Sequence, residues 1–265
     1  MVQREGALVS DEDPIAACAE IVLKGDPDRF LATMAAPLAA RKHLFPVFAF
    51  NTEVARAPWA SQEAMISEMR LQWWVDVLEE IATRAQVRRH PVATSLGDIL
   101  DPADAKALSA LVRARRWDIY NDPFEDDAHF SDYLDKTSGV LMEVAVGLTG
   151  DPKDRELARA LGGVQGLANW FRAAAELETR GRIPFVDGRA DTLAGLARGA
   201  LEKLSELRQV PVARASLPAL RTAWMCASIL KQVVKDPALV GQARLGLSEF
   251  SKKTRLLALG VTGRW

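Results

Sequence analysis

The spacing of apolar residues is the feature that most limits the fold of this chain. Apolar side chains recur three or four residues apart along most of the sequence, and runs rich in Val, Ile and Thr with strict alternation are absent. The first spacing places side chains on one face of an α-helix, whereas a half-buried strand needs alternation. The helix formers Ala, Leu, Arg and Glu are also the dominant residues. The sequence therefore predicts an all-α fold.

The clearest helical pattern follows Ser61, which we expect to be the N-cap of that helix. Glu63 would then lie in the first turn, where a carboxylate complements the helix dipole. The apolar residues that follow share one face, and we expect this stripe to pack into the core: Ile66, Met69, Trp73, Val77 and Ile81.

Turn and cap signals divide the rest of the chain into further helices. We expect helices over 14–25, from 28 onward, over 37–56 with a kink at Pro46, from 91 and from 102, and over 129–148, 153–178, 191–208, 214–235 and 248–260. Hydrophobic residues make up 49% of the sequence, enough for a sizeable core, and no repeat or linker divides it. We predict one domain over residues 14–265, preceded by a polar tail over 1–13.

Charge and hydropathy exclude several classes of function. The net charge is −1 and the pI is near 6.4, so the chain lacks the basic surface that a nucleic acid partner requires. The N-terminus has no apolar signal region, and no run approaches the ~18 apolar residues of a membrane span. We expect a cytoplasmic protein.

Two acidic clusters have the spacing of a possible magnesium site. A proline interrupts each of them, so each straddles a helix boundary, and we interpret both as solvated turns and N-caps rather than as metal ligands. No His and Cys spacing builds a zinc site either, so we predict no metal site. The clusters are Asp118, Asp122 and Asp126, and Asp98, Asp101 and Asp104.

Four short motifs occur together in one order along the chain. They are Phe48-Ala49-Phe50-Asn51, Met69-Arg70-Leu71-Gln72-Trp73-Trp74, His90-Pro91-Val92, and Gln165 to Arg172 followed by Arg180-Gly181-Arg182-Ile183. In this arrangement the chain resembles the squalene/phytoene synthase family. The resemblance implies a helical bundle of the isoprenoid synthase type with a central cavity, in which two aspartate-rich helices hold magnesium ions on prenyl diphosphates.

The aspartates that the family uses are missing here. Ala55, Arg56 and Trp59 stand at the first motif, and Ala173 and Leu177 at the second. A set of magnesium ions on two diphosphates needs many oxygen ligands, which these side chains do not supply. The resemblance therefore implies a vestigial pocket with no catalytic residues and no cofactor. Its expected residues come from two facing helices: Phe50, Asn51, Glu53, Ala55, Arg56, Gln165, Asn169, Arg172, Ala173, Glu176 and Leu177.

The chain resembles most a non-catalytic branch of this family, the mitochondrial assembly factor for respiratory complex I. The matching residues include Asn51 to Ala55, Tyr133 with Thr137-Ser138, and the stretch from Val210 to Ala219. The resemblance implies that a membrane-arm subunit or an assembly intermediate of complex I is the partner. A bacterial relative would act from the inner face of the cytoplasmic membrane.

The C-terminal stretch is basic, with an apolar stripe that Phe250, Leu257 and Val261 could form. Such a helix can lie on an anionic membrane, or it can be a last core helix with a solvated basic face. We retain both interpretations. The first predicts that the membrane or partner is contacted by Lys252, Lys253 and Arg255.

Two alternatives to an assembly factor remain open. The cavity could bind a lipid or a prenyl chain without catalysis. The protein could also be an active prenyltransferase that binds magnesium through unusual ligands, namely Glu53, Glu176 and Glu178.

Overall fold

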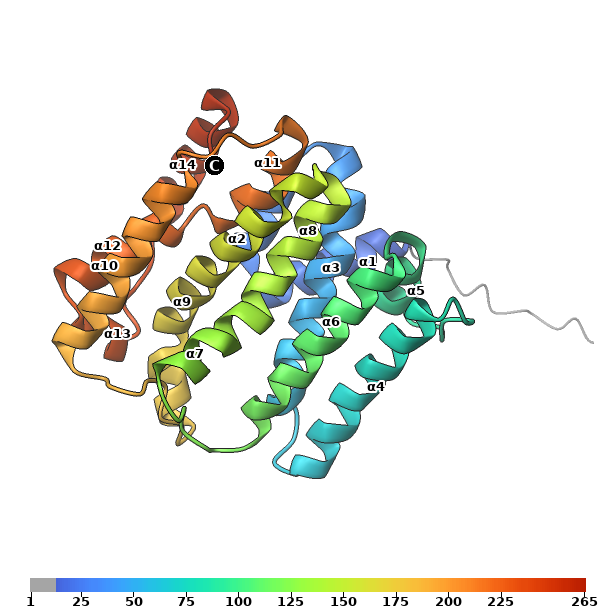
Figure 1. The fold of residues 1–265 in the computed structure, drawn as a ribbon, viewed down its shortest axis with the longest axis horizontal. Coiled ribbons are helices and arrows are strands. Elements are labelled where there is room, and N and C mark those ends of the chain that lie inside the picture. Colours follow the sequence, from blue (N-terminus) through green and yellow to red (C-terminus); the bar gives the residue numbers. More distant parts are fainter. Residues whose placement is uncertain (1–12) are drawn as a thin grey trace, which may run out of the picture.

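The computed structural model describes residues 13–265, and this part of the chain forms helices and turns with no strand (Figure 1). The all-α prediction is confirmed. The predicted polar tail lies almost wholly outside the described residues. The α-helices are α1 (Pro14–Gly25), α2 (Pro27–Met34), α3 (Leu38–Arg56), α4 (Ala64–Ala82), α5 (Pro91–Ile99), α6 (Pro102–Ala114), α7 (Asp127–Leu134), α8 (Val140–Thr149), α9 (Arg155–Thr179), α10 (Ala190–Leu207), α11 (Leu217–Leu220), α12 (Cys226–Lys235), α13 (Ala238–Gly241) and α14 (Glu249–Thr262).

Short turns of tighter or wider helix connect several of these elements. The 3₁₀ turns are η1 (Ala57–Trp59), η2 (Arg115–Ile119), η4 (Pro152–Asp154), η5 (Arg214–Ser216) and η6 (Arg221–Ala223), and η3 (Asp135–Gly139) is a π turn.

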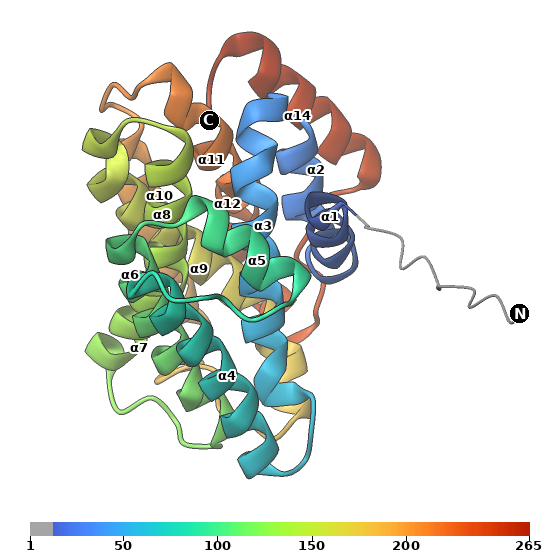
Figure 2. The same ribbon diagram turned by 90° about the vertical axis from the view of Figure 1, so that its right-hand side faces the viewer.

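The long helices run side by side (Figure 1). α3, α8 and α9 form the middle of the bundle, α4 and α6 pack together at one edge, and α10 and α12 pack together at the other. The buried apolar residues form one continuous cluster that extends from α1 to Trp265. α14 lies on the outside, and none of its residues is fully buried (Figure 2). The central pair α3 and α9 therefore decides what any interior site contains.

Helix starts follow from capping residues that precede a proline. The side chain of Asp13 accepts from Ile15 N before Pro14, and that of Asp101 accepts from Asp104 N at 2.7 Å before Pro102. The predicted cap at Ser61 is wrong, because α4 begins at Ala64. Ser61 Oγ accepts from Glu63 N instead, in the turn before the helix.

The predicted stripe on α4 is only partly correct. Val77 and Ile81 are buried, but Met69 is 66% exposed and Ile66 is 37% exposed, while Trp73 is half-buried. Five other residues of α4 are buried with them: Ser67, Leu71, Trp74, Val75 and Leu78. The helix is apolar on more than one face, and spacing alone does not say which face meets the core.

The helix predicted over 129–148 exists as α7, η3 and α8 in succession. The π turn η3 was not predicted. In it Thr137 Oγ1 donates to Tyr133 O at 2.6 Å, and a Cβ on Gly162 of α9 would lie 2.4 Å from Ser138 O. Arg159 of α9 forms ion pairs with Asp135 and Glu143. Close backbone contact and paired charges therefore fix α9 against this wide turn.

The segment predicted as one helix over 214–235 is divided into η5, α11, η6 and α12. Pro218 lies in the first turn of α11 and has no N–H to continue an earlier helix, so the chain restarts there. The other predicted helices correspond to observed ones within a few residues, and α13 was not predicted. Pro46 lies inside α3, which continues through it from Leu38 to Arg56.

Candidate functional site

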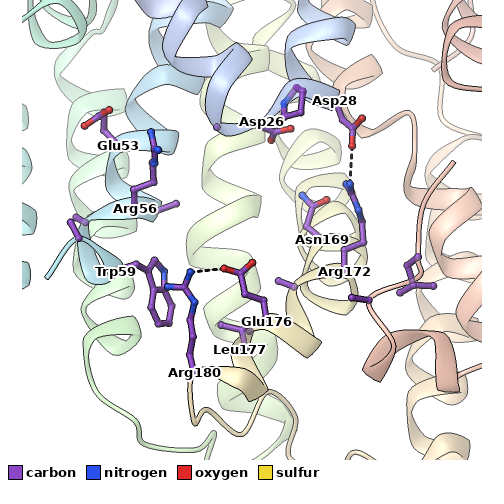
Figure 3. A pocket seen from close by; sticks show the side chains of 18 of the residues that line it. Asp26, Asp28, Glu53, Arg56, Trp59, Asn169, Arg172, Glu176, Leu177 and Arg180 are labelled. Carbon is purple, nitrogen blue, oxygen red and sulfur yellow. Dashed lines mark hydrogen bonds and ion pairs between the residues drawn. The ribbon is translucent and has the colours of Figure 1, made fainter. Parts of the chain in front are cut away.

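A polar cavity of about 1060 Å³ lies between the C-terminal half of α3 and the C-terminal half of α9 (Figure 3). The rest of its wall comes from the end of α1, the start of α2, η1 with Ala60, Arg70 of α4, and residues 243 and 245. Its charged residues are four acids and four arginines: Asp26, Asp28, Glu53, Glu176, Arg56, Arg70, Arg172 and Arg180. Acidic and basic side chains are thus present in equal number.

Most of the residues expected in a vestigial pocket lie around this cavity. Glu53, Ala55 and Arg56 line it from α3, and α9 contributes Asn169, Arg172, Ala173, Glu176 and Leu177. Asn51 lines an adjoining inner recess of about 240 Å³, whose wall also includes Ala55, Asn169 and Ala173. Glu178, named as a possible ligand, is exposed and is not among the lining residues.

Two of the expected residues do not line the cavity. Phe50 is fully buried, with its ring edge-on to Trp74 at a centroid distance of 5.2 Å. Gln165 Nε2 donates to Thr222 O at 2.8 Å, beside a pocket of only about 20 Å³. Phe50 precedes Asn51 by one residue, which on a helix turns its side chain by ~100° away from the cavity. The expectation is wrong for Phe50, and Gln165 has a structural hydrogen bond instead.

Three of the four acids in the cavity wall already have a cation. Asp28 Oδ2 is 2.9 Å from Arg172 Nη2, and Asp28 Oδ1 is 2.8 Å from Lys252 Nζ of α14. Asp26 pairs with Arg29 and caps α2 by accepting from Arg29 N. Glu176 pairs with Arg180, which lies four residues later at the C-terminal end of α9 (Figure 3). Within residues 13–265, only Glu53 of these four acids has no cation within 4.0 Å.

These donors do not fit a cluster of magnesium ions. Mg²⁺ needs octahedral oxygen ligands that are free to approach it, and Asp28 and Asp26 are held by arginine and lysine instead. Across the described residues, no group of three His, Cys, Asp or Glu side chains is arranged to hold a metal. At the stretch where the family resemblance implies aspartates, Trp59 lies under the Arg180 guanidinium at 4.7 Å from the ring centre, and Arg56 adds a second cation.

The inner recess contains a buried network that the sequence did not reveal. Arg115 Nη1 donates to Asp118 Oδ2 at 3.1 Å and to the Tyr133 hydroxyl at 2.8 Å, and that hydroxyl donates to Asp118 Oδ1 at 2.7 Å. Burial raises the pKa of Tyr133 well above its usual range, so the phenol keeps its proton. Trp117 and Trp170 pack around this network. The recess therefore ends in polar groups and aromatic rings.

The interpretation of the two acidic clusters as solvated turns and N-caps is partly correct. Asp126 caps α7 and Asp101 caps α6 through their side chains, as expected. The solvated interpretation is wrong for Asp118, and it is also wrong for Asp104, whose two oxygens lie 2.6 and 3.0 Å from the Arg155 guanidinium. Arg155 is 51 residues from Asp104 in the chain, so no local signal distinguishes this buried aspartate from a solvated one.

The basic residues of α14 have different roles. Lys252 is 16% exposed and pairs with Asp28 and Glu249, and Arg255 Nη1 donates to Ser228 Oγ at 2.6 Å. These two contacts attach the helix to the bundle, so of the three expected contact residues only Lys253 is exposed. The apolar stripe faces outward, with Phe250, Leu257 and Val261 each at least 70% exposed. None of the helices in the described residues is long and apolar enough to cross a membrane.

Comparison with known proteins agrees with this geometry. The family model for squalene/phytoene synthase matches residues 22–185. A Drosophila melanogaster protein named "NADH dehydrogenase (ubiquinone) complex I, assembly factor 6 homolog" is 30% identical over 165 residues, which are 59% of this chain and 49% of that protein. The human "NADH dehydrogenase (ubiquinone) complex I, assembly factor 6" is 24% identical over 170 residues, 63% of this chain and 51% of that protein. The chain spans about half the length of these curated relatives.

A solved structure of a dehydrosqualene synthase in complex with ligand has the same fold. It aligns with a TM-score of 0.71 over 94% of this chain and 96% of that chain, at 16% sequence identity. The predicted helical bundle of the isoprenoid synthase type is confirmed. Because the family model covers well over half of the sequence, the chain belongs to the squalene/phytoene synthase family.

Proposed function

We propose that this protein is a member of the family without prenyltransferase activity and that it helps to assemble respiratory complex I. The observation that carries the proposal is the cavity wall. Ala55, Arg56, Ala173 and Leu177 line it where the family resemblance implies aspartates, and the acids Asp26, Asp28 and Glu176 are paired with cations. A wall in which acidic and basic charges balance does not concentrate divalent cations as a diphosphate-binding site must.

The names of the curated relatives support the second half of the proposal. They are assembly factors of complex I. The family model that this chain matches, over residues 22–185, includes the cavity helices α3 and α9. A membrane-arm subunit or an assembly intermediate of complex I is then the partner. We place the protein at the inner face of the cytoplasmic membrane, because α14 presents Phe250, Leu257 and Val261 outward beside the exposed Lys253.

Turnover assays test the loss of chemistry. Purified protein with magnesium or manganese and farnesyl or geranylgeranyl diphosphate is expected to release no pyrophosphate above background. Among residues 13–265, Glu53 is the acid of the wall that has no cation within 4.0 Å, so it is the ligand on which an active enzyme would depend. Turnover that disappears in Glu53→Gln or Glu176→Gln would replace our proposal with the prenyltransferase alternative.

A deletion strain tests the assembly role. Loss of the gene should lower the amount and activity of assembled complex I, and should leave carotenoid and hopanoid pools unchanged. Complementation with the double variant Glu53→Gln/Glu176→Gln should restore complex I fully, because neither carboxylate is required for binding a partner. Normal complex I with a depleted isoprenoid would contradict the assembly role.

Variants of α14 test the location. Lys253→Glu should weaken association with anionic membranes, and added salt should reduce the difference from wild type, because exposed charges are screened over about 10 Å at 0.1 M salt. Glu249→Lys would be a poor probe, since Glu249 pairs with Lys252 and the change disturbs the attachment of the helix. Equal membrane association of wild type and Lys253→Glu at low salt would remove Lys253 from the proposed contact.

A further inference from the structure

A second hollow lies outside the bundle, on the surface of α4 that the sequence assigned to the core. It has a volume of about 450 Å³ and lies between the end of α3 and the first half of α4, with His90 at the start of α5 closing one side. α4 lies at one edge of the bundle in Figure 1 and faces the viewer in Figure 2. The residues that line this outer groove are Glu53, Ala57, Ile66, Met69, Arg70, Trp73, Trp74 and His90.

The floor of the outer groove is apolar and well packed. The Trp73 and Trp74 rings meet edge-on at 4.8 Å, and the His90 ring meets them at 5.3 and 5.6 Å. Met69 and Ile66 stand above this floor and are exposed. An apolar hollow of this volume, with a few polar groups at one end, has the size and composition of sites that bind small molecules.

The polar end of the outer groove is continuous with the cavity. Glu53, Ala57 and Arg70 line both hollows. Arg70 is exposed, and no carboxylate of residues 13–265 lies within 4.0 Å of its guanidinium. The same holds for Arg56, the neighbour of Ala57 in the cavity wall. Where the two hollows meet, Arg70 of the outer groove and Arg56 of the cavity wall are therefore two arginines without an ion pair among residues 13–265, beside one such carboxylate, Glu53.

We infer that the outer groove binds a single-chain amphiphile, with its anionic head group at Arg70 and its apolar tail over Met69, Ile66 and Trp73. Charge complementarity selects an anionic head, and Arg70 can donate to a carboxylate or a phosphate in a bidentate manner. The tail would remove from water the apolar side chains that the fold leaves exposed. This site lies outside the bundle, and it does not depend on the role in complex I assembly.

Fluorescence quenching by brominated ligands tests the inference, because bromine quenches a tryptophan only on contact. The full chain is titrated, below the micelle concentration, with a brominated fatty acid and with a brominated lysophosphatidic acid of the same chain length. Saturable quenching by at least one of them is expected, and its amplitude should fall in Trp73→Phe. Binding of both identifies any anionic head, and binding of the second alone identifies a phosphate head. No saturable quenching by either would overturn the inference.

Two substitutions on α4 form a matched pair. Met69→Asp places a charge in the path of the tail and should weaken binding about tenfold or more, which corresponds to ~1.4 kcal/mol. Met65→Asp makes the same change on the same helix at a residue that is 73% exposed and does not line the outer groove, so affinity should stay unchanged. Equal effects of the two variants would mean that the ligand adsorbs nonspecifically, and the inference would fail.

The head group is tested separately. Arg70→Ala should weaken binding of the anionic ligand about fivefold, and it should not change binding of a brominated alcohol of equal chain length. If the alcohol and the anionic ligands bind wild type equally, Arg70 does not recognise the head, and the assignment of an anionic amphiphile is wrong.

Discussion

The cavity between α3 and α9 and the outer groove on α4 are neighbours with opposite character. In the cavity, three of four acids are held by cations, so the charges of the wall largely satisfy one another. In the outer groove, Met69 and Ile66 are exposed, and Arg70 has no carboxylate within 4.0 Å among the described residues. The charged groups of the cavity thus largely neutralise one another, whereas the groups without a partner among residues 13–265 lie on the surface. An unsatisfied surface is where binding to other molecules gains most free energy.

The buried network behind the cavity should carry the largest stability cost. Asp118→Ala leaves Arg115 without its carboxylate in a buried setting, which should cost about 3 to 5 kcal/mol of the free energy of unfolding. Urea unfolding measures this. Asp118→Asn, which keeps an acceptor for Tyr133 and Arg115, should cost less than the alanine variant. A cost near zero for Asp118→Ala would show that the recess is hydrated rather than sealed.

Substitutions on the two faces of α4 compare a residue of the core with a residue of the outer groove. Leu71→Ala removes a fully buried side chain and should cost about 2 to 4 kcal/mol, because it leaves a cavity in the core. Met69→Ala, two residues away on the groove face, should change the free energy of unfolding by less than about 0.5 kcal/mol. Urea unfolding of both variants under one condition makes the comparison. Similar costs would mean that Met69 is covered in solution and that the outer groove is not open.

Attachment of α14 should show a smaller and more local effect. Lys252→Met removes one cation from Asp28 while Arg172 remains, so a loss of about 1 to 2 kcal/mol is expected. Amide hydrogen exchange over 249–262 should accelerate, because no residue of α14 is fully buried. Lys253→Met on the same helix is the control and should leave exchange unchanged. Uniform acceleration across the whole chain would instead indicate a global effect.

The smallest effect concerns His90 and pH. Burial lowers the pKa of His90, and Glu53 opposes this in part. The unfolded chain then binds more protons than the folded chain between the lowered pKa and the ordinary value near 6.5, so stability is lost as pH falls through that window. His90 is half-exposed, which limits the effect to less than about 1 kcal/mol. The free energy of unfolding should fall more between pH 7.5 and 5.5 in wild type than in His90→Asn, which can still cap α5. Equal falls would show that the pKa is not lowered.

Most helices could be predicted from the sequence, because a capping residue and a proline mark a helix start within a few residues. Asp101 before Pro102 and His90 before Pro91 mark their helix starts correctly. The facing stretches of the cavity followed from the family resemblance and not from spacing. The face of α4 could not be predicted, since Met69 and Leu71 are both apolar and only tertiary packing distinguishes them.

The ion pairs of the cavity wall and of the core could not be predicted from the sequence either. Arg172 and Asp28 are 144 residues apart in the chain, and Arg155 and Asp104 are 51 residues apart. Nothing near any of these residues indicates its partner. An acidic residue in a solvated turn and one in a buried ion pair look alike in sequence, which is why Asp104 and Asp118 were assigned to the surface.

The position of Asp28 between two helices makes the cavity and α14 thermodynamically dependent on each other. Its two carboxylate oxygens hold Arg172 of α9 and Lys252 of α14. If an anion drew Arg172 away, Lys252 would be the one cation of residues 13–265 still paired with the buried Asp28 carboxylate. Detaching α14 would then cost more free energy, because it would leave that carboxylate unpaired. By linkage, a detached α14 disfavours that anion by the same factor. An occupied cavity and a released C-terminal helix are therefore antagonistic states of this protein.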